Sequence, residues 1–164
     1  SGDLLYREQN LSQYSDSQLT EYRRFHVGFV FQFYNLISSL TARENVALVT
    51  DIAPDPMTPG EALALVGLAG RMDHFPSQLS GGEQQRAAIA RAVISKPELL
   101  IADEPTGNVD PEMANRLLRL LVELNRLGTT VLIASHDIGL VRSLGAPVLE
   151  LADGKLIDDG RRAA

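Results

Sequence analysis

The sequence predicts an α/β fold in which a mostly parallel sheet carries an inserted helical subdomain. From residue 81 onward, short apolar runs alternate with amphipathic segments, as in strands buried between helices. One more apolar run, residues 26–31, stands far upstream of a long helical stretch. Because no flexible linker interrupts the chain, we expect one domain with two lobes. Residues 33–95 form the helical lobe, and residues 1–32 and 96–164 form the α/β core.

The first third of the chain predicts three elements. Residues 1–9 read as a short extended piece, and a helix starts near Ser15, which has capping-box spacing with Gln18. The run HVGFVF at residues 26–31 is apolar and β-branched enough for a buried strand.

A helical pattern then covers residues 36–79. Its clearest start is at Thr58, which is followed by a proline at the first helical position and by Glu61 at the third. Gly67 ends that helix.

The second half predicts strands and helices in alternation. In order they are a helix over 81–95, a strand over 98–103, a helix over 111–127 closed by Gly128, a strand over 130–135, a short helix near 138–143, and a strand over 147–151 that leads into a hairpin at Asp153 and Gly154.

Composition excludes several classes of protein. The formal net charge of −6 argues against nucleic acid as a partner, since such proteins carry a basic stripe. The chain has no cysteine, so it has no disulfide framework and no thiolate metal site. No apolar run approaches the roughly 20 residues that span a bilayer, so we expect another polypeptide to do any spanning. Because the first residue is Ser1, we expect the gene product to start further upstream.

The string LSGGEQQR at residues 79–86 predicts an anion site at a helix start. Ser80 and Glu83 have capping-box spacing, and Gly81 and Gly82 remove side chains that would block a ligand. Free amide groups and the positive end of the helix dipole favour a phosphate there. A capped helix with glycines for close packing shows the shorter pattern Ser-x-x-Glu too, so the whole string carries the prediction.

Two carboxylates end the predicted strand at residues 98–103. Asp103 and Glu104 therefore stand at the carboxyl edge of a parallel sheet, where ligands of α/β proteins bind. One carboxylate suits Mg²⁺ and the other suits the attacking water. Alternation along a strand would send the two side chains to opposite faces.

Two further strand ends carry polar residues. His136 follows the strand at 130–135 and is placed to donate a hydrogen bond to a γ-phosphate. Gln32 follows the strand at 26–31, where its amide can reach Mg²⁺ or the attacking water. Neither residue by itself indicates a function, but the expected position at the same sheet edge as Asp103 and Glu104 favours a role for both in the site.

Together these motifs resemble the nucleotide-binding domain of ABC ATPases over nearly the whole chain. The resemblance implies ATP and Mg²⁺ as cofactors and transport as the role. It matches Gln32 to the Q-loop, Ser80, Gly81 and Gly82 to the signature motif, Asp103 to the magnesium-binding aspartate, Glu104 to the catalytic base, Asp110 to the D-loop and His136 to the switch histidine.

Within that family, two strings resemble the lipoprotein-release and macrolide-export ATPases: FQFYNLISSLTARENVAL and DEPTGN. The stretch from Pro97 onward also resembles the cell-division member of the group.

The departure from the family is upstream of Gln32. Nothing in residues 1–31 matches the phosphate-binding P-loop pattern G-x-x-x-x-G-K-[ST], and Ser1-Gly2-Asp3 resembles the segment that follows the P-loop helix. We therefore expect an N-terminally truncated fold of this type, with apolar sheet surface left uncovered. We also expect a polypeptide of these residues alone not to hydrolyse ATP.

The resemblance implies a head-to-tail dimer with a second ATPase subunit, and an integral membrane permease-type subunit as partner. It implies a cytoplasmic protein, peripheral on the inner membrane. The alternative is a non-hydrolysing fragment or interaction module that keeps the fold. Chromosome-maintenance and DNA-repair heads share the signature motif but need a long coiled coil between it and the Q-loop, and no sustained heptads occur here. Translation-factor relatives usually carry two cassettes and a basic linker, and neither is visible in this sequence.

Overall fold

The computed structural model describes residues 3–6 and 9–158. They divide into two compact units, Ser1–Ala134 and Ser135–Ala164. This division falls at a different place from the predicted lobes. The limits of the helical subdomain, residues 33–95, therefore stay a prediction, and each unit is taken by itself below.

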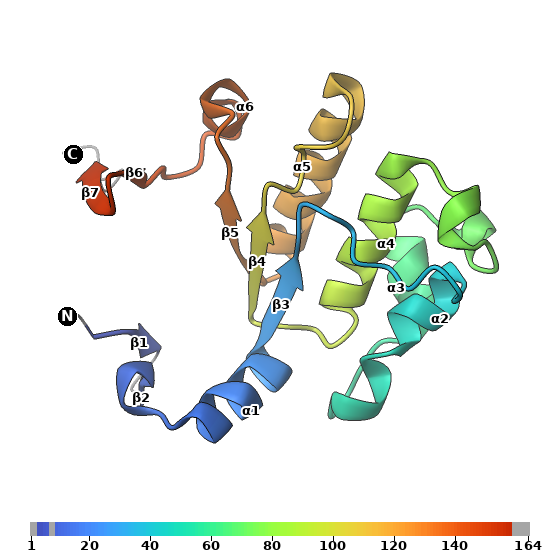
Figure 1. The fold of residues 1–164 in the computed structure, drawn as a ribbon, viewed down its shortest axis with the longest axis horizontal. Coiled ribbons are helices and arrows are strands. Elements are labelled where there is room, and N and C mark those ends of the chain that lie inside the picture. Colours follow the sequence, from blue (N-terminus) through green and yellow to red (C-terminus); the bar gives the residue numbers. More distant parts are fainter. Residues whose placement is uncertain (1–2, 7–8, 159–164) are drawn as a thin grey trace. The chain divides into compact units, whose positions relative to one another are not determined.

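A three-stranded parallel sheet forms the centre of the first unit (Figure 1). Its strands are β3 (Val27–Val30), β4 (Leu99–Asp103) and β5 (Thr130–Ala134), with β4 in the middle. In this register, Phe29, Ile101 and Leu132 stand side by side across the sheet. Strand β3 begins one residue later than predicted, because His26 is the last residue of the preceding helix.

Two long helices cover one face of this sheet. They are α4 (Gly81–Val93), which packs against β3, and α5 (Pro111–Arg126), which packs against β5. The sheet residues on this face are buried: Gly28, Val30, Leu100 and Ala102. Helix α4 comes very close, since a Cβ on Gly28 would lie 2.4 Å from the carbonyl oxygen of Ala92. Glycine at this position therefore sets how tightly α4 can pack on β3.

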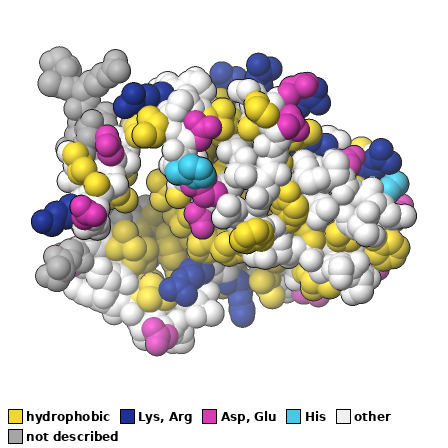
Figure 2. Space-filling view, turned by 45° about the horizontal axis from the view of Figure 1, so that its top comes forward, with side chains coloured by type: hydrophobic (Ala, Val, Ile, Leu, Met, Phe, Trp, Pro, Cys, Tyr) yellow, Lys and Arg dark blue, Asp and Glu magenta, His cyan; other side chains and the backbone are white. Residues whose placement is uncertain are grey.

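The other face of the sheet is apolar but open. Phe29, Phe31 and Leu132 keep 37%, 45% and 50% of their surface exposed. The rings of Phe29 and Phe31 are nearly parallel, with centroids 6.1 Å apart. Hydrophobic side chains also reach the surface among charged ones in the space-filling view (Figure 2). The expectation of uncovered apolar sheet surface is confirmed.

The predicted helical stretch is a set of short helices packed on α4. It contains α2 (Ala42–Ala47) and α3 (Pro59–Leu65), both with complete capping boxes, and the 3₁₀ turns η2 (Thr50–Ile52), η3 (Ala69–Arg71) and η4 (Pro76–Gln78). Gly67, with φ of +73°, follows α3 as predicted. The buried side chain of Asn45 accepts from the amide of Ile37 and donates to three backbone carbonyls, which anchors the chain before α2.

The chain before the sheet forms a small hairpin and one helix. The hairpin pairs β1 (Leu5–Tyr6) with β2 (Gln9–Asn10), and the 3₁₀ turn η1 (Leu11–Gln13) follows. Helix α1 (Asp16–His26) starts at Ser15, whose hydroxyl and backbone form the predicted capping box with Gln18. It leads directly into β3.

The second unit holds α6 (Ile138–Ser143), β6 (Glu150–Ala152) and β7 (Lys155–Asp158). The hairpin at Asp153 and Gly154 is confirmed, and both residues have positive φ. The strand predicted over 147–151 was placed too early. It starts at Glu150, which pairs with Asp158 of the antiparallel β7, so a pairing across the hairpin and not the local apolar pattern marks its start. In the part of the chain that the structure describes, none of the helices is long and apolar enough to cross a membrane.

Candidate functional site

The carboxyl edge of the parallel sheet carries three of the predicted site residues. Asp103 is the last residue of β4 and is exposed, and Glu104 follows it. Gln32 lies two residues beyond the end of β3. Parallel strands point their carboxyl ends the same way, so these side chains start from one edge, where α/β proteins bind ligands.

The backbone of Glu104 makes a sharp turn at the end of β4. Its φ is +45°, in the left-handed region that residues other than glycine rarely adopt. Its amide donates to the carbonyl of Ala134 at 2.9 Å, and its carbonyl accepts from the amide of Gly107 at 3.1 Å. The prediction that strand alternation separates Asp103 from Glu104 was therefore wrong in its reason. Glu104 lies outside the strand, and this turn sets its direction.

Gly107 lies between Gln32 and Glu104. A Cβ on Gly107 would come within 3.2 Å of the side-chain nitrogen of Gln32 and 3.6 Å of the Cβ of Glu104. Both side chains therefore border the same small space. The structure brings the predicted Q-loop glutamine and the predicted catalytic base to one place, although 72 positions separate them in the sequence.

Asn108, whose side chain was not among the predicted site residues, joins this place to the backbone of Gln32. Its amide nitrogen donates to the backbone carbonyl of Gln32 at 2.9 Å. Its own carbonyl accepts from the hydroxyl of Tyr34 at 3.5 Å, a long contact. The signal available in the sequence was the string DEPTGN, in which a polar amide follows the carboxylate pair by four residues.

The N-terminus of α4 is built as predicted. The Ser80 hydroxyl accepts from the amide of Glu83 at 3.3 Å, and the Glu83 carboxylate accepts from the Ser80 amide and hydroxyl at 2.8 and 2.9 Å. The backbone amide of Ser80 is the largest cause that holds the pKa of Glu83 below its ordinary value. Arg71 donates to the other carboxylate oxygen at 3.2 Å. The negative charge at this helix start is therefore already balanced by a cation.

The two glycines of α4 make room for neighbouring side chains. A Cβ on Gly81 would lie 2.8 Å from the hydroxyl of Tyr34, and one on Gly82 would lie 2.6 Å from Met113 of α5. Gly82 is buried, whereas Ser80 is exposed. Close packing thus accounts for the absence of side chains at both glycines. The backbone amides of both glycines lie in the first turn of α4, and amides of a first turn have no acceptor within the helix.

Asp110 and the residues after β5 show local structural roles. The carboxylate of Asp110 caps α5 by accepting from the amides of Glu112 and Met113, each at 3.0 Å. Asp137 caps α6 in the same manner, accepting from the amide of Leu140 at 2.9 Å. His136 precedes Asp137 and belongs to the second unit. A role of Asp110 or His136 toward a nucleotide stays a prediction.

The donor set at the sheet edge suits a hard cation. Among residues 3–6 and 9–158 no group of three or more His, Cys, Asp or Glu side chains could hold a metal. The exposed carboxylate of Asp103 and the amide oxygen of Gln32 are oxygen ligands of the kind that Mg²⁺ takes, usually together with waters and substrate phosphates. The residues present therefore fit Mg²⁺ bound with a nucleotide.

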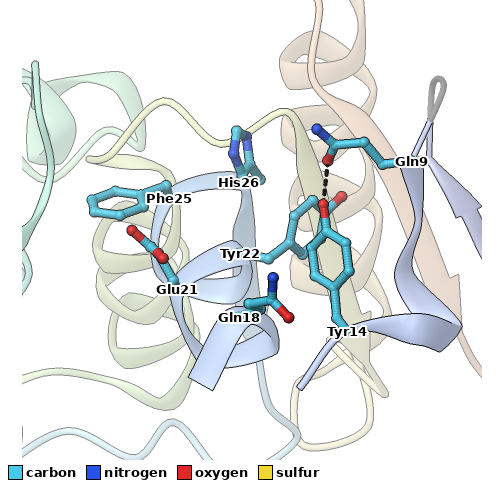
Figure 3. Close-up of a pocket in the computed structure, with 7 residues that line it drawn as sticks. All are labelled: Gln9, Tyr14, Gln18, Glu21, Tyr22, Phe25 and His26. Atoms are coloured by element: carbon cyan, nitrogen blue, oxygen red, sulfur yellow. Dashed lines mark hydrogen bonds between the residues drawn. The ribbon is translucent and has the colours of Figure 1, made fainter. Parts of the chain in front are cut away.

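An open hollow of about 270 Å³ lies elsewhere, around α1 (Figure 3). Its lining residues are Gln9, Tyr14, Gln18, Glu21, Tyr22, Phe25 and His26. The Tyr14 hydroxyl donates to Gln9 at 2.6 Å, and the rings of Tyr22 and His26 stack. Because α1 leads into β3, this hollow borders the amino end of that strand. It is not part of the predicted site.

Comparison with known proteins places the chain. The family model described as ABC transporter matches residues 1–107. The lipoprotein-releasing system ATP-binding protein LolD of Idiomarina loihiensis is 42% identical over 150 residues, which are 88% of this chain and 66% of LolD. The chain thus spans slightly less than two thirds of that relative.

Two solved structures share the fold at 35% identity. The ATP-binding cassette MJ0796, dimeric and in a post-hydrolysis state bound to ADP and Pi, superposes with a TM-score of 0.83. A dimeric structure of MJ0796, a bacterial ABC transporter cassette, superposes with a TM-score of 0.82. Each match covers 99% of this chain and 75% of the other. The mixed α/β fold with a parallel sheet is that of these cassettes, and the chain belongs to the ABC transporter family.

Proposed function

We propose that the protein is the ATP-binding and ATP-hydrolysing subunit of an ABC-type transporter or transporter-like complex, and that it powers a separate membrane partner. The observation that carries this proposal is the edge of the sheet. There Asp103 ends β4, and Gln32 and Glu104 border the same space beside Gly107. The similar cassette MJ0796 has been solved with bound ADP and Pi, the products of ATP hydrolysis.

Each residue at the edge has a distinct role in this proposal. Bound Mg²⁺ would neutralise charge on the nucleotide phosphates. Asp103 holds that cation, Gln32 contributes an amide oxygen to it or to the attacking water, and Glu104 orients the water and accepts its proton. His136 belongs to the second unit, and its proposed role, donating a hydrogen bond to the γ-phosphate, rests on the family resemblance alone.

The signature helix serves a nucleotide held mainly by another subunit. Ser80, Gly81 and Gly82 stand at the start of α4, where backbone amides and the helix dipole attract a phosphate. We propose a head-to-tail dimer in which each helix closes the nucleotide site of its partner. The dimeric state of MJ0796 supports this arrangement.

The test of the function is steady-state phosphate release from Mg-ATP. It compares a polypeptide of residues 1–164 with a form that carries a P-loop segment ahead of residue 1. We expect turnover from the longer form and none at a comparable rate from the shorter one, since the main cradle for the α- and β-phosphates is a P-loop. No turnover from the longer form would favour the interaction module instead, and full turnover from the shorter form would remove the need for a P-loop.

The membrane partner docks beside the Q-loop in this proposal. Phe33 is 70% exposed and Ile37 is 45% exposed, directly behind Gln32. Such apolar exposure on a segment that leads from the site suits a protein partner. This surface would face a permease-type subunit on the cytoplasmic side of the inner membrane.

Phe33→Glu tests the docking surface. It should abolish pull-down of the membrane partner while the circular dichroism spectrum stays native. Leu127→Glu is the matched control, because Leu127 is equally apolar and 73% exposed but lies beyond the end of α5. If both variants bind the partner as the parent does, the docking surface lies elsewhere.

A further inference from the structure

Residues 32–35, here called the Q segment, are held from two sides by hydrogen bonds. On one side stands α4, through Arg91 near its C-terminal end. On the other stands the loop 105–108, through Asn108. The Q segment forms neither helix nor strand, so side-chain contacts take the place of secondary structure in fixing its path.

Arg91 makes the stronger of the two attachments. One guanidinium nitrogen donates to the carbonyl of Asn35 at 2.6 Å, and the second donates to the carbonyl of Tyr34 at 3.2 Å. Burial lowers the pKa of Arg91. A cation that is partly withdrawn from water needs acceptors, and these two carbonyls supply them.

The backbone of Asn35 fits this contact. Its φ is +51°, in the left-handed region that asparagine tolerates better than most residues. The carbonyls on either side of this turn both reach the same guanidinium fork. Lysine has a single point of charge and cannot reproduce such a two-pronged contact.

The loop 105–108 is itself fixed to α4. The buried Gln85 donates from its side-chain nitrogen to the carbonyl of Pro105 at 2.9 Å. Asn108 in turn donates to the carbonyl of Gln32. Helix, loop and Q segment are therefore joined pairwise, and Gln32 sits where the loop and the Q segment meet.

Resting on the function proposed above, we propose that Arg91 is a positioning residue for Gln32. By holding the carbonyls of Tyr34 and Asn35, it keeps the side chain of Gln32 beside Gly107 and Glu104. Ser80 and Arg91 stand at opposite ends of one helix, about 16 Å apart at the helical rise per residue. A shift of α4 when its first turn meets a phosphate is thereby passed directly to Gln32.

A double-mutant cycle in the P-loop-bearing protein tests this role. Arg91→Met should lower kcat by roughly tenfold to a hundredfold, the loss expected when a reacting group is misplaced by about 1 Å. The KM for ATP should change little, because Arg91 donates to backbone carbonyls of the Q segment and is not one of the residues proposed to contact the nucleotide. In a Gln32→Ala background, Arg91→Met should cause no further loss, since the residue through which it acts is gone.

The cycle has one control variant and one substitute variant. Arg116→Met removes an exposed arginine that pairs with Glu112 one turn away on the same helix, and it should leave kcat unchanged. If Arg91→Met does not fold, the cycle is run with Arg91→Lys, which keeps the stem and charge but loses the fork. Equal loss in the parent and Gln32→Ala backgrounds, or no loss in the parent, would overturn the positioning role.

A second readout is independent of hydrolysis. The 164 residues contain no tryptophan, so Phe33→Trp behind a tryptophan-free P-loop segment gives a single fluorophore in the Q segment. Arg91→Met should lower the anisotropy of that indole, because the segment moves more freely, whereas Arg116→Met should not. Failure of the proposed function would show as an inactive parent with this anisotropy difference intact. Failure of the inference would show as unchanged anisotropy in an active protein.

Discussion

The two ends of the parallel sheet carry side chains of different kinds. The carboxyl end has Asp103, Glu104 and Gln32, two carboxylates and one amide that start from the same edge. The amino end has the hollow around α1, where aromatic rings stack and His26 pairs with Glu98 at 3.3 Å. This hollow is thus at the end without the carboxylate pair. Chemistry at an α/β sheet depends on which strand ends meet, so a hollow alone does not mark the end where ligands bind.

The largest expected effect is that of Glu104→Gln at the carboxyl end. In the P-loop-bearing protein it should lower phosphate release by roughly 10²–10⁴-fold, the usual contribution of a general base. Glutamine keeps the shape of the side chain but cannot accept the proton. ATP should stay bound and hold a dimer, which size-exclusion chromatography with Mg-ATP would detect. A monomer at saturating ATP would argue against the two-subunit site.

Asp103→Asn should have the next largest effect. It removes negative charge from the proposed metal position, so Mg²⁺-dependent nucleotide binding should weaken by roughly tenfold or more, about 1.4 kcal/mol. Titration calorimetry with and without Mg²⁺ measures it. The binding that remains without Mg²⁺ should be similar in the parent and the variant. A loss of equal size under both conditions would mean that Asp103 acts on the fold and not on the cation.

A matched pair of helix caps separates structure from function. Ser80 and Ser15 make the same capping box on α4 and α1, so replacing either with alanine should cost about 1 kcal/mol of unfolding free energy. Only Ser80→Ala should also weaken ATP-dependent dimerisation, because only Ser80 is proposed to meet a phosphate. Denaturant unfolding and light scattering give the two readouts. Equal dimerisation by both variants would reduce Ser80 to a cap.

The smallest effect belongs to the amino end. Tyr14→Phe removes the hydrogen bond to Gln9 at the hollow and should lower the free energy of unfolding by at most about 1 kcal/mol. Phosphate release should stay at the parent rate. A fall of tenfold or more would show that the two ends are coupled, and the contrast between them would no longer hold.

The parts that could be predicted from the sequence are those made by neighbours in the chain. The caps at Ser15, Thr58 and Ser80 need only residues three positions apart, and all three form as expected. The parallel strands follow from apolar runs, and their shared edge follows from the topology. The placement of Gln32 near Glu104 was therefore within reach of pattern and order alone.

The parts that could not be predicted depend on distant contacts. Gly81 meets Tyr34 and Gly82 meets Met113 across separations that no local pattern reveals. The attachment of Arg91 to the Q segment spans 56 positions. Local pattern also placed the start of β6 three residues early, since its pairing with β7 decides it.

The positive φ of Glu104 makes the most stable residue at this position different from the one that the proposed reaction needs. A left-handed conformation costs a residue with a side chain on the order of 1 kcal/mol, and glycine adopts it freely. Glu104→Gly would thus relieve that conformational cost and remove the carboxylate in the same step. Selection for thermal resistance alone should enrich glycine here, and under the proposed function the selected proteins would be more stable but would have lost the catalytic base.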